Sequence, residues 1–274
     1  MMMKEKNLFG LIGKKLGHSL SPEIHEKIFE GLNIKGNYSL YELDEKSVSK
    51  GIESFKLLGY KGVNVTIPYK EEVIKTLDYI SEDAKNIGAV NTIAFKNGRV
   101  EGYNTDYYGF GMLLEYNNII VEEKKIVVLG NGGASKAVIQ YLKDKKARDI
   151  YLVSRRCRES EEVDGVHIIN YEMLENLNDG DVIVNCTPVG MYPNVEGTPV
   201  KESIIKEFGS AVDLIYNPME TEFLALGKKN GLNIANGLLM LVGQAVKAEE
   251  IWNDISIDKD TIMKVYEFLL NNFK

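Results

Sequence analysis

Cysteine is scarce in this sequence, and long apolar runs are missing. The chain has only 2 cysteines, Cys157 and Cys186, which cannot form a disulfide framework or a cysteine-based metal site. We therefore expect no metal and a reducing, cytoplasmic environment. No stretch is long enough to span a bilayer, and the opening MMMKEKNLFGLIG lacks the apolar run of a signal peptide.

An excess of positive charge is also missing. The 33 lysine and arginine residues face 40 aspartate and glutamate residues, a formal net charge of -7. This balance argues against a general nucleic-acid or membrane-surface binder. Hydrophobic residues make up 44% and charged residues 27%, as in soluble globular proteins. A chain of 274 residues is long for one core, so we expect two domains.

Strand-like segments alternate with helical segments in the first part of the chain. Asn97-Gly98 lies between two strand-like segments and is a strong signal for a tight hairpin turn. The alternation predicts an α/β sheet. We expect strands over 8–13, 38–43 and 63–68, a hairpin over 89–104, and helices over 21–32, 47–58, 71–80 and 105–117.

A second alternating series begins near residue 124. Its strands are nearly continuous apolar runs, as expected for parallel strands buried on both faces. The last part of the chain is helical and cannot extend this sheet, so we expect it to pack on the first domain. The predicted strands cover 124–130, 149–155, 166–170, 181–188 and 211–217, with helices over 134–145, 237–252 and 259–273. The predicted domains are 1–106 with 238–274, and 107–237.

The segment IVVLGNGGASKAV combines a buried strand, a glycine turn and a helix. Gly130, Gly132 and Gly133 permit a tight turn, and the helix N-terminus offers free N–H groups to a phosphate. Ser135 stands where the spacing G-x-G-x-x-G has its third glycine. An ordinary strand-to-helix turn is the alternative, but the flanking strand and helix favour dinucleotide binding.

The end of the next strand distinguishes NAD from NADP. An acidic side chain there binds the ribose 2′-hydroxyl of NAD, whereas a basic one suits the 2′-phosphate of NADP. This sequence has Ser154, Arg155 and Arg156 and no carboxylate at that point. Because the arginine fork matches phosphate geometry, we expect NADP rather than a merely solvated basic loop.

Four polar clusters lie where predicted strands of the first domain end: GHSLSP, NVTIPYK, GAVNT and GYNTD. Each has a local explanation, such as Ser21 capping the helix that Pro22 begins. Together they indicate a site, because ligands bind beyond the carboxyl ends of strands in an open α/β sheet. Hydroxyls and amides suit a small polyhydroxylated molecule, and a lysine near an aspartate suits proton transfer. We assign no role to His18 or His25 and expect His25 at the helix surface.

With GNGGASKA, NCTPVGM, DLIYNP and NGLLMLVGQA, these motifs resemble in order those of the shikimate dehydrogenase family over nearly the whole chain. The resemblance implies an α/β substrate domain, a Rossmann-like NADP domain, and C-terminal helices that return to the first domain. It implies reversible NADPH-dependent reduction of 3-dehydroshikimate to shikimate, in aromatic amino acid biosynthesis. The sequence leaves the oligomeric state open between a monomer and a homodimer.

The resemblance also implies a role for individual residues. Lys70 and Asp106 match the catalytic pair. The substrate-binding positions are Ser19, Ser21, Asn64, Thr66, Asn91, Tyr216 and Gln244. The cofactor-binding positions are Gly130, Gly132, Gly133, Ala134, Ser154, Arg155, Arg156, Thr187, Gly237 and Met240. Ser154-Arg155-Arg156 departs from the Asn-Arg-Thr that is common in the family but keeps the positive charge.

Two alternatives remain open at this point. One is a related enzyme that also oxidises quinate and uses NAD, against which the arginine cluster argues. The other is a non-catalytic cofactor-binding protein, against which the presence of both Lys70 and Asp106 argues.

Overall fold

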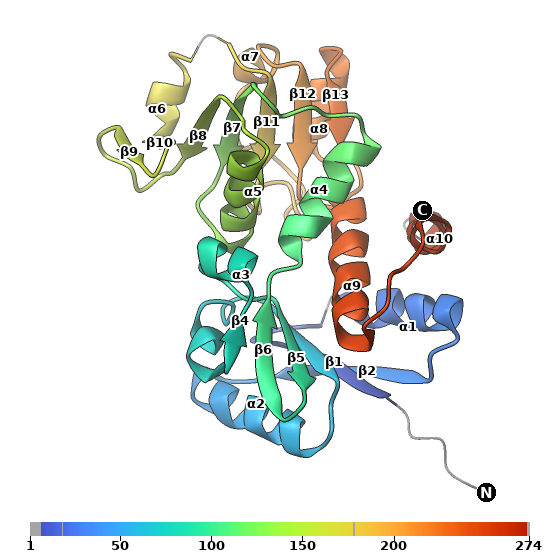
Figure 1. The fold of residues 1–274 in the computed structure, drawn as a ribbon. Helices are drawn as coiled ribbons and strands as arrows, with labels where there is room; N and C mark the ends of the chain where they lie inside the picture. The colour runs from blue at the N-terminus through green and yellow to red at the C-terminus, as the bar shows by residue number, and fades with distance from the viewer. Residues whose placement is uncertain (1–6, 18, 178, 273–274) are drawn as a thin grey trace, which may run out of the picture. The chain divides into compact units, whose positions relative to one another are not determined.

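The computed structural model describes residues 7–272 except 18 and 178. It is an α/β protein, as the alternating pattern predicts (Figure 1). The chain forms two compact units: Met1–Gly109 together with Val242–Lys274, and Phe110–Leu241. Both boundaries fall inside helices, namely α4 (Asp106–Tyr116) and α9 (Leu238–Asn253).

A mixed sheet forms the centre of the first unit. Within the described residues its six strands have the order β2-β1-β3-β5-β6-β4. β1 pairs in parallel with β2 and β3, and β4 with β6, whereas β5 runs antiparallel to β3 and β6. The strands are β1 (Asn7–Gly13), β2 (Gly36–Glu42), β3 (Gly62–Val65), β4 (Tyr79–Ile80), β5 (Thr92–Lys96) and β6 (Arg99–Tyr103).

The predicted hairpin is confirmed as β5 and β6. Asn97 and Gly98 both adopt positive φ, 51° and 75°, which is the conformation that a two-residue hairpin turn requires. Asn104 and Thr105 follow β6, and α4 begins at Asp106. The hairpin therefore brings the residues before β5 close to the start of α4.

The helix predicted over 71–80 is wrong. After β3 the chain makes a turn over 67–71 and a short 3-10 helix, η2 (Glu72–Thr76). It then pairs with the edge of β6, where the backbone N–H of Asp78 donates to Val100 O at 2.8 Å. The unpaired backbone N–H and C=O groups at the edge of β6 give residues 78–80 hydrogen-bond partners, which favours a strand over a helix here. Ile67, which falls inside the strand predicted over 63–68, is 73% exposed because β3 ends at Val65.

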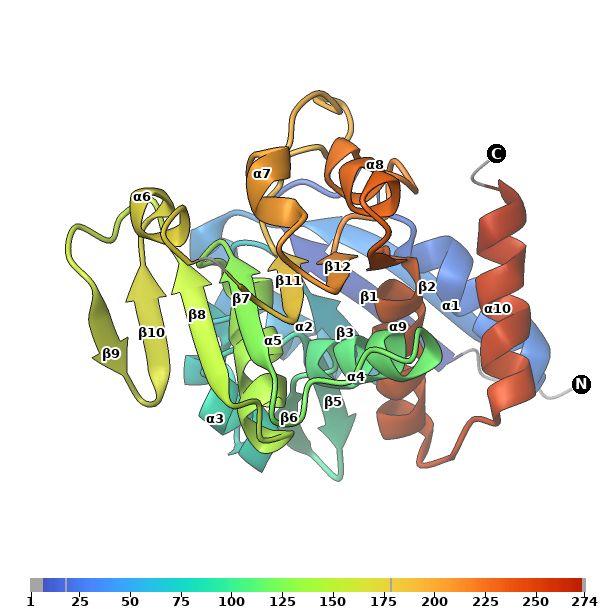
Figure 2. The ribbon, with the colours of Figure 1, turned by 90° about the horizontal axis from the view of Figure 1, so that it is seen from above.

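A second sheet forms the centre of the second unit (Figure 2). Within the described residues its seven strands have the order β13-β12-β11-β7-β8-β10-β9, and all pairs are parallel except β9 with β10. β7, β8, β10, β11 and β12 match the apolar runs that predict them, whereas β9 and β13 were not predicted from the sequence. The strands are β7 (Lys125–Leu129), β8 (Asp149–Val153), β9 (Glu161–Val163), β10 (Val166–Ile169), β11 (Val182–Asn185), β12 (Ser210–Asp213) and β13 (Asn233–Ala235).

The closing helices belong largely to the first unit, as expected. Trp252 of α9 is 4% exposed and packs in one core cluster with Phe9 and Phe29. Its indole N–H donates to Ile93 O at 2.9 Å. α10 lies beside α1, as Figures 1 and 2 both show.

The remaining helices are short or cover the sheets. Among the described residues, no helix is both long and apolar enough to cross a membrane. The first unit contains α1 (Ser21–Leu32), η1 (Glu45–Ser47), α2 (Val48–Leu57), α3 (Glu82–Ile87) and α10 (Lys259–Asn272), and the second contains α5 (Gly133–Asp144), α6 (Tyr171–Leu174), α7 (Glu202–Ile205) and α8 (Glu222–Lys229).

Candidate active site

An acid, a base and an amide meet at the start of α4. Lys70 Nζ lies 2.6 Å from Asp106 Oδ2. Asn91 Nδ2 donates to the other oxygen, Asp106 Oδ1, at 2.8 Å. The Lys70 and Asp106 side chains are 16% and 11% exposed, so the ion pair is largely shielded from water yet accessible. An ammonium in this position is a proton donor beside an anchored carboxylate.

The loop around Asp106 is held by hydrogen bonds on every side. Its backbone N–H donates to Asn104 Oδ1 at 3.1 Å, and Thr105 N–H donates to Asn91 Oδ1 at 2.7 Å. The Thr105 hydroxyl also bonds to Asn91 Oδ1 rather than facing solvent. Lys70 is tied to the same cluster because its carbonyl accepts from Val90 N–H at 2.7 Å. These hydrogen bonds join Lys70, Asn91, Thr105 and Asp106 in one cluster.

The prediction for Ser21 in the serine loop, residues 19–21, is wrong. Ser21 is not the N-cap of α1: it is the first helical residue, and the cap position is Leu20 with no side-chain bond. The Ser21 N–H donates to Ser19 Oγ at 3.3 Å, and the Ser19 hydroxyl donates to Ser21 Oγ at 3.2 Å. The preceding backbone at Ser19 is held by its N–H, which donates to Leu16 O at 2.9 Å. Both hydroxyls are therefore fixed by each other.

Asn64 and Thr66 lie at the end of β3. Asn64 is 4% exposed, and its Nδ2 donates to Thr92 Oγ1 at 3.0 Å and to Asn91 O at 3.3 Å. The Thr66 N–H donates to Ile12 O at 2.9 Å, which anchors the residue beside β1. These contacts connect the β3 end to the cluster around Asp106.

Two further polar residues of the first unit, Gln244 and His25, lie on helices. Gln244 is half-buried on α9, within the first unit. His25 is fully buried, contrary to the expected surface position, because Glu249 of α9 reaches its ring: the two groups lie 2.6 Å apart. His18 lies outside the described residues.

The glycine turn of the second unit has the geometry of a close backbone approach. Gly130 has φ of 96°, and a Cβ there would lie 2.7 Å from Thr187 Cγ2. A Cβ at Gly132, the N-cap of α5, would meet open space. Gly133 and Ala134 open α5, and Ser135 donates its hydroxyl to Gly132 O at 2.7 Å. The free N–H groups of this helix start suit a phosphate.

The basic cluster follows β8. Ser154 is 8% exposed, and its Oγ accepts from Arg156 N–H at 3.2 Å. Arg155 and Arg156 are both exposed. The serine shapes the turn while the two guanidinium groups remain available to an anion.

A buried carboxylate supports the loops that follow β11 and β12. Asp213 Oδ1 accepts from Asn185 Nδ2 and from Ile215 N–H, both at 3.0 Å, and Oδ2 accepts from Thr221 Oγ1 at 2.6 Å. Burial raises the pKa of Asp213 to about 6. Asn185 also accepts from the Thr187 hydroxyl at 2.7 Å. This network places Thr187.

Tyr216 lies in the loop that follows β12, and the residue just before α9, Gly237, contacts the same loop. Burial raises the pKa of Tyr216, so its hydroxyl stays a donor. Gly237 cannot hold a side chain: a Cβ there would lie 2.0 Å from Leu214 O. Its N–H donates to Ile215 O at 2.9 Å, and Met240, one turn later, is 7% exposed.

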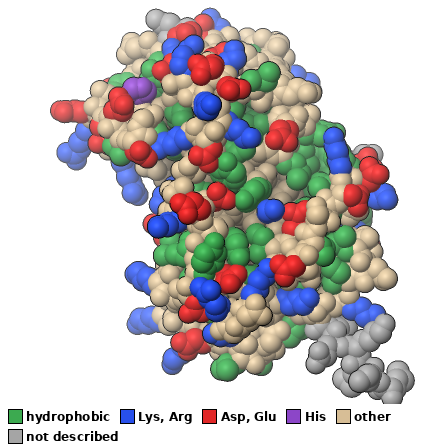
Figure 3. All heavy atoms as spheres, in the orientation of Figure 1, with side chains coloured by type: hydrophobic (Ala, Val, Ile, Leu, Met, Phe, Trp, Pro, Cys, Tyr) green, Lys and Arg blue, Asp and Glu red, His purple; other side chains and the backbone are tan. Residues whose placement is uncertain are grey.

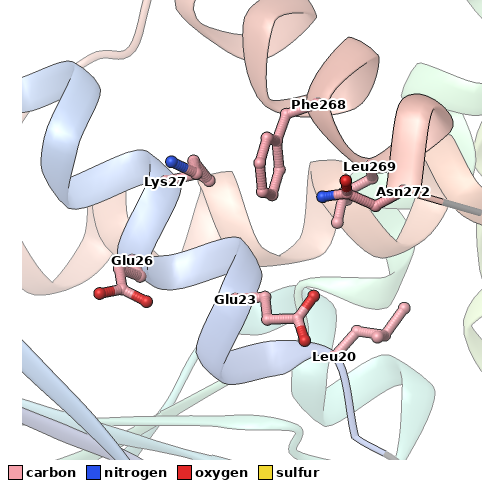
Figure 4. Close-up of a pocket in the computed structure, with 7 residues that line it drawn as sticks. All are labelled: Leu20, Glu23, Glu26, Lys27, Phe268, Leu269 and Asn272. Carbon is pink, nitrogen blue, oxygen red and sulfur yellow. The ribbon is translucent and has the colours of Figure 1, made fainter.

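A pocket of about 470 Å³ lies elsewhere in the first unit, between α1 and α10 (Figure 4). Lys27 Nζ lies over the Phe268 ring, 4.5 Å from the ring centroid. Acidic and basic side chains are interspersed over the face that Figure 3 shows. The pocket contains none of the predicted site residues. It is lined by Leu20, Glu23, Glu26, Lys27, Phe268, Leu269 and Asn272.

Comparison with known proteins assigns the family. Residues 11–93 match the model of the shikimate dehydrogenase substrate binding domain. The chain is 50% identical to the shikimate dehydrogenase (NADP(+)) of Clostridium beijerinckii over 97% of this chain and 99% of that protein. The chain belongs to the shikimate dehydrogenase family. A Clostridium perfringens relative with the same name is 51% identical over 97% of this chain and 99% of that protein.

A solved structure agrees with this assignment. The structure of a chorismate mutase/shikimate 5-dehydrogenase fusion protein from Clostridium acetobutylicum superposes with a TM-score of 0.95 at 48% identity. It covers 98% of this chain and 99% of that one. The two-domain α/β fold expected for the shikimate dehydrogenase family is therefore present.

Some contacts of the site were not predicted from the sequence. Tyr38 donates its hydroxyl to Asn64 Oδ1 at 2.7 Å. Asn104 orients Asp106, and Thr92 bonds to both Asn64 and Asn91. Asn104 and Thr92 stand inside the motifs GYNTD and GAVNT, which was a usable signal, whereas Tyr38 lies in an ordinary alternating strand.

Proposed function

We propose that this protein catalyses the reversible, NADPH-dependent reduction of 3-dehydroshikimate to shikimate. The observation that carries the proposal is the Lys70–Asp106 ion pair of 2.6 Å, anchored by Asn91 and surrounded by hydroxyl and amide groups. The names of the relatives support the substrate and the cofactor. All the proposed substrate-binding residues except Tyr216 lie in the first unit, and the proposed NADP-binding residues lie in the second.

The residues of the second unit fit NADP. The open space at Gly132 and the positive φ of Gly130 let the backbone approach a pyrophosphate. Arg155 and Arg156 are exposed and match the 2′-phosphate in charge and geometry. When bound, the nicotinamide supplies the hydride that the carbonyl carbon receives.

Lys70 supplies the proton. Its ammonium donates H⁺ to the carbonyl oxygen as the C–H bond forms, so the ketone becomes an alcohol and Lys70 becomes a neutral amine. Asp106, held by Asn91, fixes the lysine and accepts a hydrogen bond from a substrate hydroxyl. In the reverse direction the neutral amine takes the alcohol proton, so oxidation of shikimate improves as pH rises.

The remaining polar residues bind the substrate. Ser19, Ser21 and Thr66 donate to the carboxylate and ring hydroxyls, and Gln244 both donates and accepts. Tyr216 contributes a further hydroxyl. We place the reaction in the cytoplasm and expect a monomer or homodimer, which size-exclusion chromatography with light scattering measures.

Mixing the purified protein with shikimate and NADP⁺ and following reduced-nicotinamide absorbance tests the proposal. We expect reduction of NADP⁺, faster than with NAD⁺ and faster with shikimate than with quinate. Faster turnover of quinate with NAD⁺ would favour the related enzyme. No change with any of the four pairs would favour a non-catalytic cofactor-binding protein.

A further inference from the structure

The Tyr38 hydroxyl contacts a proposed substrate-binding residue, because it donates to Asn64 Oδ1 at 2.7 Å. Burial raises the pKa of Tyr38, and the Ser21 side chain lowers it. The Ser19 hydroxyl donates to Ser21 Oγ at 3.2 Å. Tyr38 is therefore bonded to Asn64 at the end of β3 and influenced by the serine pair at the start of α1.

The contacts of Asn64 fix which way its amide faces. Its Nδ2 group donates to Thr92 Oγ1 and to Asn91 O, which uses both amide hydrogens. Its Oδ1 accepts from Tyr38, because burial raises the pKa of Tyr38 well above its usual value and keeps the phenol protonated. Within the part of the chain that the structure describes, Tyr38 is the donor to Oδ1, so the second lone pair of this oxygen can accept from a ligand hydroxyl.

The Tyr38 ring is held from behind by a buried pair. The His25 ring stacks on it with centroids 4.0 Å apart and an interplanar angle of 12°. His25 Nδ1 lies 2.6 Å from Glu249 Oε1, and both side chains are 0% exposed. Glu249 Oε2 accepts from Asn253 Nδ2 at 2.8 Å. None of these groups has a step in the proposed reaction.

The buried pair costs stability. His25 Nε2 is buried and has no hydrogen-bond partner among the described residues, and an unsatisfied buried polar atom is unfavourable. An apolar side chain would fill the same space without that cost. We attribute the presence of His25 to a geometric role, in which its ring stacks on Tyr38 and holds it in place.

We propose that Tyr38 is a positioning residue for substrate recognition. Its hydroxyl holds Asn64 in the orientation that receives the substrate, and the His25–Glu249 pair fixes the plane of its ring. This inference rests on the proposed function, since it names residues that act on the same substrate.

The Tyr38→Phe variant tests the inference, because it keeps the stacked ring and removes only the hydroxyl. We expect the KM for shikimate to rise about tenfold, the effect of losing one buried hydrogen bond. The KM for NADP⁺ should stay close to the wild-type value, and the melting temperature should fall by a few degrees because Asn64 Oδ1 loses its buried donor. In an Asn64→Ala background the same change should raise the shikimate KM less than about twofold, because the hydroxyl acts through Asn64.

Tyr60→Phe is the matched control. It removes another tyrosine hydroxyl of the same unit, one bonded to Tyr41 and to none of the proposed site residues, and should leave both KM values unchanged. An unchanged shikimate KM in Tyr38→Phe, or an equal rise in both backgrounds, overturns the inference while the proposed function stands. A wild-type protein that neither turns over nor binds shikimate overturns both.

Discussion

In the first unit the proposed site consists of side chains held by other side chains, whereas in the second it depends on positions that lack a side chain. Asp106 receives hydrogen bonds from Lys70 and Asn91. Gly130 and Gly237 have no room for a Cβ beside Thr187 and Leu214. A substitution therefore removes a group in the first unit and adds an obstruction in the second.

The difference follows from what each unit is proposed to bind. A small ring with several oxygens is recognised by directed donors and acceptors, which need fixed side chains. A pyrophosphate is bound by backbone N–H groups, which need a bare, tightly turned main chain. Variants that alter turnover without stability, or stability without turnover, can test this contrast.

Lys70→Ala should have the largest effect. It removes the proton donor beside Asp106, so we expect kcat for shikimate oxidation to fall by about 10²–10⁴. The KM for NADP⁺ should stay within about twofold of wild type, since Lys70 lies in the first unit. Steady-state kinetics with each substrate varied in turn measures both quantities.

The exposed lysine of α3, Lys85, provides the control. Lys85→Ala should turn over at the wild-type rate. If Lys70→Ala kept near-normal turnover, lysine would have no place in the mechanism, and the first unit would not depend on this side chain.

Two glycines of the same turn should respond differently. Gly130→Ala puts a Cβ at a positive φ and 2.7 Å from Thr187 Cγ2, so we expect the free energy of unfolding to fall by about 1–3 kcal/mol. Gly132→Ala, whose Cβ meets open space, should change it by less than about 0.5 kcal/mol while weakening NADP⁺ binding. Urea denaturation and calorimetric titration with NADP⁺ separate the two effects. Equal destabilisation by both substitutions would contradict the distinction between strained and open positions.

Local signals carried most of the sequence predictions that the structure confirms. The hairpin is set by Asn97-Gly98, whose positive φ values need no distant partner. The central strands β7, β11 and β12 are apolar runs buried on both faces, so composition alone indicates them. The predicted proximity of Lys70 and Asp106 is present, while their catalytic role stays a prediction.

Distant contacts account for what the sequence could not predict. His25 looks like a surface residue until Glu249, 224 positions later, covers it. Residues 71–80 have helical spacing, but the free edge of β6 draws residues 79–80 into the sheet. Tyr38 shows no motif, because its proposed role depends on Asn64, which lies on another strand.

Asp213 should give the smallest effect and shows whether the second unit also depends on a side-chain network. Burial raises the pKa of Asp213 to about 6 in the folded protein, above its ordinary value of 3.8. A raised pKa stabilises the fold below the unfolded-state value, and that contribution is lost as pH rises through about 6. Between pH 5 and pH 7, wild type should therefore lose on the order of 1 kcal/mol of unfolding free energy relative to Asp213→Asn. Parallel urea denaturation of the two proteins across this range measures the difference. A constant difference would mean that the carboxylate is fully compensated by Asn185, Ile215 and Thr221, and that both units rest on satisfied side-chain networks.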